Sequence, residues 1–202
     1  MATRYRTLET ISDKRKQKLT RVLSQRQRDL TIVLENVHDP HNVSAVLRTA
    51  DAVGIFQVHL IYTQESFPKL GKKSSASAKK WIEVHHHSDV ASCFQILHNE
   101  GFHIVASHLT KSASSLFDLN LKERIAFVLG NEHRGVSDEA CRLADAIYFI
   151  PMMGMIQSLN ISVATAVSVY EALRQRQLGG MYTRPQFEQR TLDALLGEWA
   201  KK

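Results

Sequence analysis

The sequence predicts an α/β fold with a mainly parallel sheet and helices on both faces. Short apolar runs rich in Val, Ile and Phe alternate along the chain with amphipathic helical segments. This alternation is typical of βαβ units, in which a crossover helix joins two parallel strands. A hydrophobic content of 44% over 202 residues suits one globular domain of ordinary size plus appendages.

Turn and capping signals bound the elements of the first half. The strand at 31–36 ("TIVLEN") ends in a polar loop, and a helix follows over about 42–53, with Asn42 as its expected cap and Gly54 as its stop. We expect the next strands at 56–62 and 81–87. The segment 89–101 then reads as a helix closed by a glycine.

The second half continues the alternation. Residues 102–108 and 124–130 are buried-type strands, and the segment between them is loop-like. A short helix capped by Ser137 precedes a strand at 145–151. A long helix then starts near Ser158, which we expect to be its N-cap. The remaining predictions are a flexible basic loop at 71–80 and a last amphipathic helix at 185–200.

Positive charge is concentrated in the first 28 residues. They carry nine basic and two acidic side chains, a net +7 against +6 for the whole chain, so the remainder sums to about −1. Such an arm can be a solvated tail, a membrane-surface helix or a polyanion contact, and its short apolar stripe at helical spacing argues against a bilayer. We favour nucleic acid. The predicted organisation is a basic RNA-binding arm (1–28), a catalytic domain (29–180) and a C-terminal helical extension (181–202).

Several function classes are disfavoured. The N-terminus lacks an apolar signal region, no apolar run reaches about 18 residues, and the two cysteines have no metal-ligand spacing, so we expect a cytoplasmic protein with reduced thiols. The run "HHH" at 85–87 does not predict a metal, because adjacent strand residues face opposite sides. We expect no metal requirement.

Three polar loops follow strands at positions where ligands bind in open α/β sheets. They are "NVHDPHN" (36–42), "GNEHRG" (130–135) and "PMMGMIQSLN" (151–160). Neither GxGxxG nor GxxxxGK[ST] occurs, so dinucleotide and ATP lack their usual phosphate cradle. If the fold gathers these loops, they form one site.

The segments "NVSAVLRTADAVG", "FVLGNEHRGVSDE" and "IPMMGMIQSLNISVATAVSVYEALRQR" together resemble the three motifs of the SpoU/TrmH branch of SPOUT RNA methyltransferases, over about residues 30–178. The resemblance implies S-adenosyl-L-methionine as methyl donor, a C-terminal trefoil knot and a homodimer. The basic arm and the C-terminal helix are most similar to members that methylate the ribose 2′-hydroxyl of guanosine-18 in the tRNA D-loop. Alternatives are another RNA site, in ribosomal RNA or the tRNA anticodon loop, and a non-catalytic RNA-binding module.

The same resemblance assigns roles to particular residues. Arg48, otherwise an ordinary exposed helical arginine, becomes the main catalytic group, and the polar residues around it are Asn42, Glu132, Ser158 and Asn160. Residues expected to hold the cofactor are Ser107, Leu129, Gly130, Ile150, Met152, Ser158 and Leu159. Residues expected to contact tRNA are Lys14, Arg15, Lys18, Arg21, His41, Arg174 and Arg176. His41 and His133 also remain open as general bases.

Overall fold

A seven-stranded parallel sheet forms the centre of the protein, as seen in a computed structural model that describes residues 7–64, 66–67 and 78–202. The strand order is β3-β2-β1-β6-β4-β7-β5, and every neighbouring pair is parallel. The predicted α/β class is therefore confirmed. The strands are β1 (Leu30–Glu35), β2 (Gln57–Ile61), β3 (Glu83–His87), β4 (His103–Ser107), β5 (Ser114–Ser115), β6 (Ile125–Leu129) and β7 (Ala146–Phe149).

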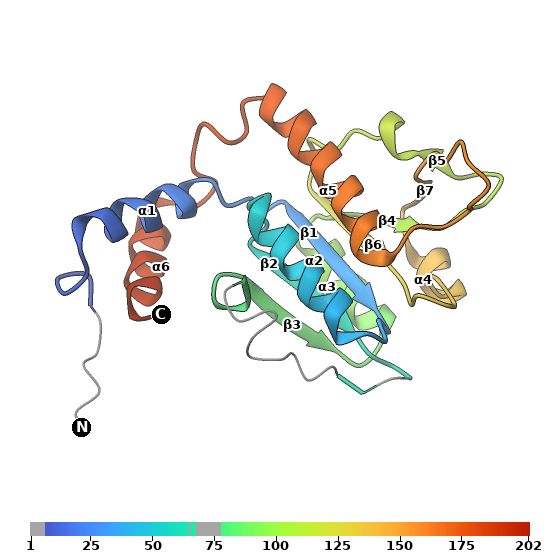
Figure 1. Cartoon of the computed structure of the whole chain (residues 1–202), viewed down its shortest axis with the longest axis horizontal. Coiled ribbons are helices and arrows are strands. Elements are labelled where there is room, and N and C mark those ends of the chain that lie inside the picture. The colour runs from blue at the N-terminus through green and yellow to red at the C-terminus, as the bar shows by residue number, and fades with distance from the viewer. Residues whose placement is uncertain (1–6, 65, 68–77) are drawn as a thin grey trace.

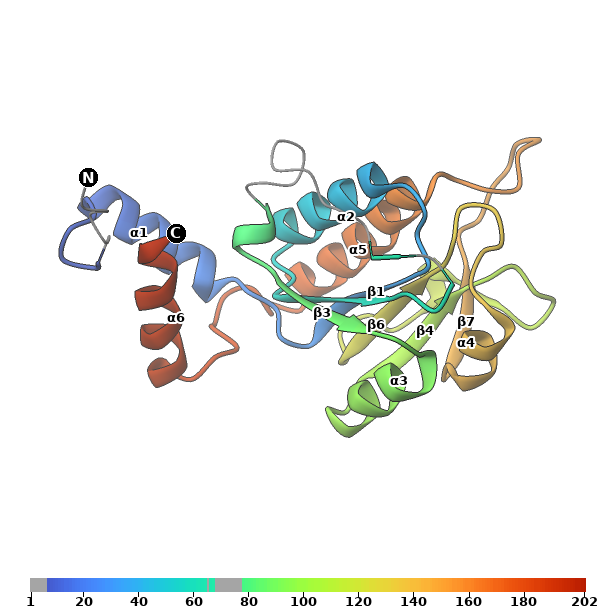
Figure 2. The same ribbon diagram turned by 90° about the horizontal axis from the view of Figure 1, so that it is seen from below.

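Helices cover both faces of the sheet (Figure 2). On one face, α2 (Pro40–Ala52) and α5 (Ile161–Leu178) pack on the larger apolar cluster, while α3 (Val90–Asn99) and α4 (Asp138–Leu143) pack on a second cluster on the other face. Strands β1 and β6 are buried along their whole length because they are covered from both sides. This explains their uninterrupted apolar sequences.

The strand order decides where the polar loops meet. Strand β1 pairs with β6, β6 with β4, and β4 with β7. All four strands run in the same direction, so the loops that follow β1, β6 and β7 leave the same edge of the sheet. The segments predicted to form one site are thus brought to one end of the molecule.

The first and last helices of the chain pack together, away from the sheet (Figure 1). Helix α1 (Asp13–Ser24) lies against α6 (Gln189–Lys201), and Leu19, Leu23 and Trp199 form their buried contact. Burying such side chains contributes about 1.5–3 kcal/mol each. The apolar stripe seen in the N-terminal arm therefore has a partner within the chain itself.

Arg26 connects this pair of helices to the sheet domain. Its guanidinium is fully buried, donates to the Ile55 carbonyl at 2.9 Å, pairs with Asp51, and lies 5.2 Å from the Trp199 ring centroid. Burial lowers the pKa of Arg26, and the Asp51 carboxylate counteracts that shift. Arg26 is thus a structural residue of the basic segment and cannot contact RNA.

Some local expectations were wrong. The segment predicted as a loop between β4 and β6 contains the two-residue strand β5 and a 3₁₀ turn at Leu116–Asp118. Asp39, not Asn42, caps α2, because its carboxylate accepts from the His41 N–H and Pro40 occupies the first turn. Most of the predicted basic loop at 71–80 lies outside the described residues. Its last three residues are described and form a 3₁₀ turn. No described helix combines the length and apolarity needed to span a bilayer.

Candidate active site

A cleft of about 410 Å³ opens at the ends of β4, β6 and β7. Its walls come from the loop after β6 and from the segment between β7 and α5. All seven residues that we expect to hold the cofactor line it: Ser107, Leu129, Gly130, Ile150, Met152, Ser158 and Leu159. The fold therefore brings this whole set together, from three separate parts of the chain.

The loop after β6 turns back on itself to form one wall. Asn131 and Gly135 exchange backbone hydrogen bonds of 2.8 and 2.9 Å, and Gly135 has a φ of +70°. A β-carbon at Gly130 would lie 2.0 Å from the Gly135 carbonyl oxygen, closer than any real contact allows. Glycine is therefore required at position 130 for the loop to close this tightly.

The Asn131 side chain fixes this loop to β1, a role that the sequence analysis missed. The amide is buried, donates to the Asn36 carbonyl at 2.7 Å, and accepts from the His133 and Arg134 N–H groups at 2.9 and 3.2 Å. Asn36 in turn has a φ of +50°, a conformation that asparagine tolerates better than most residues. An uncharged amide directly after a buried strand was the available signal.

A chain of hydrogen bonds joins the three predicted loops at the mouth of the cleft. The Asn42 Nδ2 donates to Glu132 Oε1 at 2.7 Å, and the Asn160 Nδ2 donates to Asn42 Oδ1 at 3.2 Å. Glu132 also accepts from the backbone N–H groups of His38 and Asp39 at 3.0 and 3.3 Å. The convergence expected from the parallel topology is therefore present, with Asn42 as the central link.

The charge state of Glu132 follows from these contacts. Burial raises the pKa of the carboxyl, but the hydrogen bonds from Asn42 and from the His38 and Asp39 backbone outweigh it and bring the pKa below its usual value. Glu132 is therefore ionised at neutral pH. A fixed negative charge at the cleft wall favours a positively charged ligand.

The start of α5 differs from the expectation. Asn160, not Ser158, caps the helix, since its Oδ1 accepts from the Ser162 N–H at 2.8 Å and from the Ser162 hydroxyl at 2.6 Å. Ser158 is exposed and lines the cleft. Asn160 thus does two things with one amide: its oxygen caps the helix, and its nitrogen reaches Asn42.

Arg48 is exposed on α2 and does not line the cleft. Within the described part of the chain its guanidinium has no hydrogen bond or ion pair. Seven residues, about two helical turns, separate it from His41, so both side chains lie on the same exposed face of α2. Helix α2 itself packs against α5.

The predicted tRNA-contacting residues fall into separate classes. Lys14, Lys18 and Arg21 are exposed on α1, while Arg15 is partly buried. Arg174 is exposed but pairs with Glu171 through two hydrogen bonds of 2.8 Å. The first three cations lie on α1, far in sequence from the cleft-lining loops, and Arg174 lies near the end of α5.

The prediction that Arg176 contacts RNA was wrong. The side chain is fully buried and donates to the Leu121 and Asp29 carbonyls at 2.9 Å, to Gln27 Oε1 at 3.1 Å and to the Asp29 carboxylate. The position of Arg176 in the last turn of a helix suggested a surface contact, but its guanidinium instead joins α5 to the start of β1. It has no surface left to offer a phosphate.

The protein is similar to RNA methyltransferases over almost its whole length. The model of the SpoU rRNA Methylase family matches residues 29–170. A tRNA (guanosine(18)-2′-O)-methyltransferase of Thermus thermophilus is 40% identical over 191 residues, which are 95% of this chain and 98% of the relative.

Solved structures agree with that match. The crystal structure of the Aquifex aeolicus TrmH/SpoU tRNA modifying enzyme superposes with a TM-score of 0.87 at 37% identity, covering 93% of this chain and 95% of the other. An AdoMet-bound rRNA methyltransferase from Sinorhizobium meliloti superposes with a TM-score of 0.66 at 25% identity, covering 77% and 59%.

Proposed function

The chain belongs to the SpoU rRNA Methylase family, and we propose that it transfers a methyl group from S-adenosyl-L-methionine to the ribose 2′-hydroxyl of guanosine-18 in tRNA. The observation that carries the proposal is the hydrogen-bonded chain Glu132–Asn42–Asn160, which links all three motif loops beside one cleft. The named activity of the 40% identical relative, matched over nearly its full length, supplies the substrate.

The cleft suits the cofactor on physical grounds. Its volume of about 410 Å³ falls within the range of about 300–1,000 Å³ typical of clefts that hold small organic ligands. The tight turn at Gly130 lets a ligand approach the backbone, Leu159 and Ile150 offer apolar surface, and ionised Glu132 offers negative charge. These features suit a ligand that has an adenine ring, whose faces pack on apolar side chains, and a cationic sulfur.

S-adenosyl-L-methionine, when bound, supplies an electrophilic methyl group. The task of the protein is then to orient a ribose 2′-hydroxyl, which is a weak acid and a poor nucleophile. We assign to Arg48 the binding of the adjacent phosphate and the stabilisation of negative charge developing on that oxygen, because its guanidinium is exposed and always protonated. Asn42 and Asn160 hold the loops that form the cleft, and Ser158 presents a hydroxyl to it.

For tRNA binding we propose two surfaces. Lys14, Lys18 and Arg21 present one row of cations on α1, and Arg48 presents a second cation on the exposed face of α2 that also carries the His41 imidazole. Arg15, partly buried, and Arg174, already paired with Glu171, play smaller parts. The α1–α6 unit therefore acts as the RNA-binding appendage of the catalytic domain, so that the predicted segments 1–28 and 181–202 work together.

We also propose that the protein works as a homodimer. Met153 and Met155 on the loop after β7 are 95% and 99% exposed, and Ile156, Val163 and Tyr170 continue this apolar surface onto α5. Contiguous exposed apolar side chains mark protein interfaces. A second copy seated here would cover the loop that forms the cleft and bring its own exposed α2 face near the site.

The proposed setting is the cytoplasm. Cys93 and Cys141 are free thiols, which fits a reducing compartment, and a tRNA substrate is found there. We expect methyl transfer to require no metal ion, and the methylation experiment tests this expectation as well.

The deciding experiment is methylation of unmodified tRNA transcripts with labelled S-adenosyl-L-methionine, followed by mapping of the modified nucleotide. We expect a single 2′-O-methyl group at guanosine-18, formed equally well after treatment with a chelator. A transcript with 2′-deoxyguanosine at position 18 is the matched control and should accept no label. A methyl group on a base, or at an anticodon-loop ribose, would overturn the assignment.

A further inference from the structure

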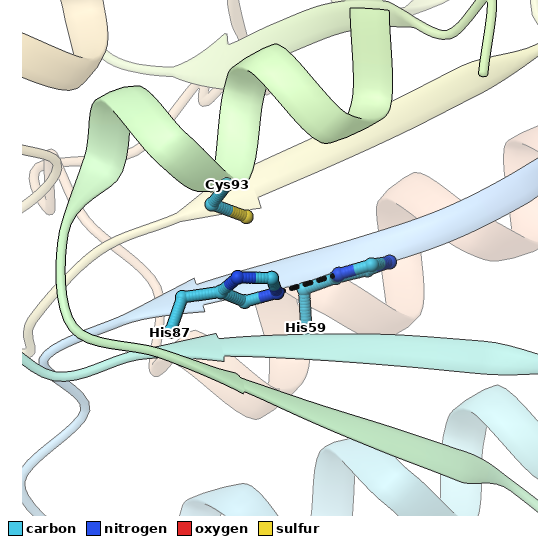
Figure 3. A group of neighbouring side chains, drawn as sticks. All are labelled: His59, His87 and Cys93. Atoms are coloured by element: carbon cyan, nitrogen blue, oxygen red, sulfur yellow. Dashed lines mark hydrogen bonds between the residues drawn. The ribbon is translucent and has the colours of Figure 1, made fainter. Parts of the chain in front are cut away.

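A second cluster of side chains that can bind a metal lies at the β3 end of the strand order, away from the cleft. His59 on β2, His87 on β3 and Cys93 on α3 point toward one another (Figure 3). One ligand atom from each residue lies within 4.8 Å of the others. Strands β2 and β3 stand at the end of the strand order away from β4 and β7, so this cluster shares no residue with the methyl-transfer site.

We propose that His59, His87 and Cys93 form a binding site for one Zn²⁺-type transition-metal ion. Imidazole nitrogen and thiolate sulfur are the donors that zinc prefers in proteins. Three protein ligands leave a fourth position for water, which can reach the site because His87 is only partly buried. The ion would tie the edge strand β3 to β2 and α3.

The geometry of the two histidines is already close to that of a metal site. His59 Nδ1 and His87 Nε2 share a hydrogen bond of 3.0 Å. Two nitrogens bound to one tetrahedral zinc, at about 2.0–2.1 Å each, lie roughly 3.3 Å apart. Bringing the Cys93 sulfur into range from a separation of up to 4.8 Å takes about 1 Å of side-chain adjustment, since zinc–sulfur bonds are about 2.3 Å.

The surroundings of His59 favour a ligand role over simple packing. The ring is buried beside those of His85 and His87, with centroids 5.0 and 5.2 Å away, and its Nδ1, which faces His87, is the nitrogen that would bind the ion. The neutral form of imidazole is the one that binds a metal ion. A well-packed core would use an apolar residue here.

Cys93 is unsuited to the main alternative, a redox role. It is fully buried, and burial raises the pKa of its thiol to about 12, whereas reactive cysteines have lowered values and are accessible. A metal ion held by the two imidazoles would favour the thiolate form of Cys93, because metal binding releases the thiol proton. The other free cysteine, Cys141 on α4, has no such neighbours among the described residues and serves as a control.

The sequence hides this site because its ligands come from three elements. The run "HHH" suggests three ligands, but the alternation of the strand sends His85 and His87 to the face under α3 and His86 to the other. Of the three, His87 joins the cluster. The register His59↔His85 and Ile61↔His87 places His59 between its two same-face neighbours.

The test uses the full-length protein, freed of any affinity tag and stripped with a chelator, titrated with Co²⁺ as a spectroscopic probe and then with Zn²⁺. We expect one equivalent of Co²⁺ to give a thiolate-to-cobalt charge-transfer band that Zn²⁺ abolishes. Cys93→Ser should remove the band, and His87→Ala should weaken binding at least 10-fold. The matched controls Cys141→Ser and His86→Ala should behave as the parent protein.

The outcomes are decisive even if Cys93→Ser fails to fold. His87 lies partly exposed on an edge strand, so His87→Ala leaves the core intact and tests the same site. Absence of the band in the parent protein, or binding unchanged by His87→Ala, would overturn the proposal. Methylation of tRNA should be the same with and without Zn²⁺, so failure of the metal site leaves the proposed function standing.

Discussion

Asn42 Nδ2 donates a 2.7 Å hydrogen bond to Glu132 Oε1, which joins the first turn of α2 to the loop after β6 across 90 residues of sequence. Asn160 then donates to the other end of the same Asn42 amide. Removing any one of these three groups leaves at least one partner unsatisfied. The contact therefore couples the shape of the cleft to the position of α2, which carries Arg48.

Glu132→Gln tests this coupling with a nearly isosteric change. The carboxylate accepts three hydrogen bonds, and an amide nitrogen would face a donor on one side. We expect kcat for tRNA methylation to fall about 10-fold or more, and the free energy of unfolding to fall by about 1–3 kcal/mol. Enzyme kinetics and urea unfolding measure the two effects. Glu139→Gln on the exposed side of α4 is the control. Equal losses of kcat and stability in the two variants would refute the role of Glu132 in linking α2 to the cleft.

The same carboxylate predicts how the variant depends on pH. The pKa of Glu132 is lowered in the folded protein, so its stabilising effect is present above the unfolded pKa of about 4.3 and is lost as pH falls through the folded value. The difference in unfolding free energy between the parent protein and Glu132→Gln should therefore be constant from pH 7 to about 5 and shrink below about 4. A difference that grows on acidification would contradict the charge assignment.

Gly130→Ala should destroy the cleft without removing any side-chain hydrogen bond. Its new methyl group would meet the Gly135 carbonyl oxygen at 2.0 Å and the Val136 nitrogen at 2.2 Å, and these are backbone atoms that cannot rotate aside. We expect loss of S-adenosyl-L-methionine binding by calorimetry, at least 100-fold in affinity. Gly154→Ala is a matched control in the loop after β7, because a methyl group there would have nothing within 4 Å of it. Unchanged binding by Gly130→Ala would show that the loop opens freely.

The gathering of the site could be predicted from the sequence because parallel strands send their carboxyl ends to one edge. The individual roles of the polar residues in these loops could not be predicted. Ser158 and Asn160 are both good N-caps, and the choice depends on where Asn42 stands, 118 residues away. Likewise Asp39 displaced Asn42 as the cap of α2 because Pro40 fits the first helical turn and Asn42 is occupied by Glu132. Long-range partners decided between locally equivalent residues.

Local sequence patterns also could not predict which charged side chains are buried. Arg174 and Arg176 are two residues apart near the end of α5, and both looked like surface cations. A two-residue step turns about 200° around a helix, so the two face opposite directions, and only the tertiary fold shows that Arg176 points inward. The pairing of α1 with α6 was hidden for the same reason, since Leu19 and Leu23 meet Trp199 at the far end of the chain.

This pair of arginines gives a stability prediction. Arg176→Gln should lower the free energy of unfolding by about 3–5 kcal/mol, because it removes the only ion-pair partner that the described structure gives Asp29 and leaves the Leu121 and Asp29 carbonyls without this donor. Arg174→Gln should cost much less, since the Arg174 guanidinium is exposed to solvent. Thermal or urea unfolding of the two variants measures the contrast, and equal costs would contradict the buried network.

The basic face of α1 gives the last prediction. Deleting residues 1–28 should weaken tRNA binding and leave cofactor binding intact, but it would also uncover the apolar side of α6, so point changes are the cleaner test. Replacing Lys14, Lys18 and Arg21 by Gln keeps the buried contact of Leu19 and Leu23. If each cation meets one phosphate, the magnitude of the slope of log K against log salt should fall by roughly 2 to 3, with S-adenosyl-L-methionine affinity unchanged. Lys16→Gln, on the opposite side of the helix, is the control. A triple variant with the parent's tRNA affinity and salt slope would show that α1 serves only to pack against α6, and the RNA would then have to be held by the α2 face alone.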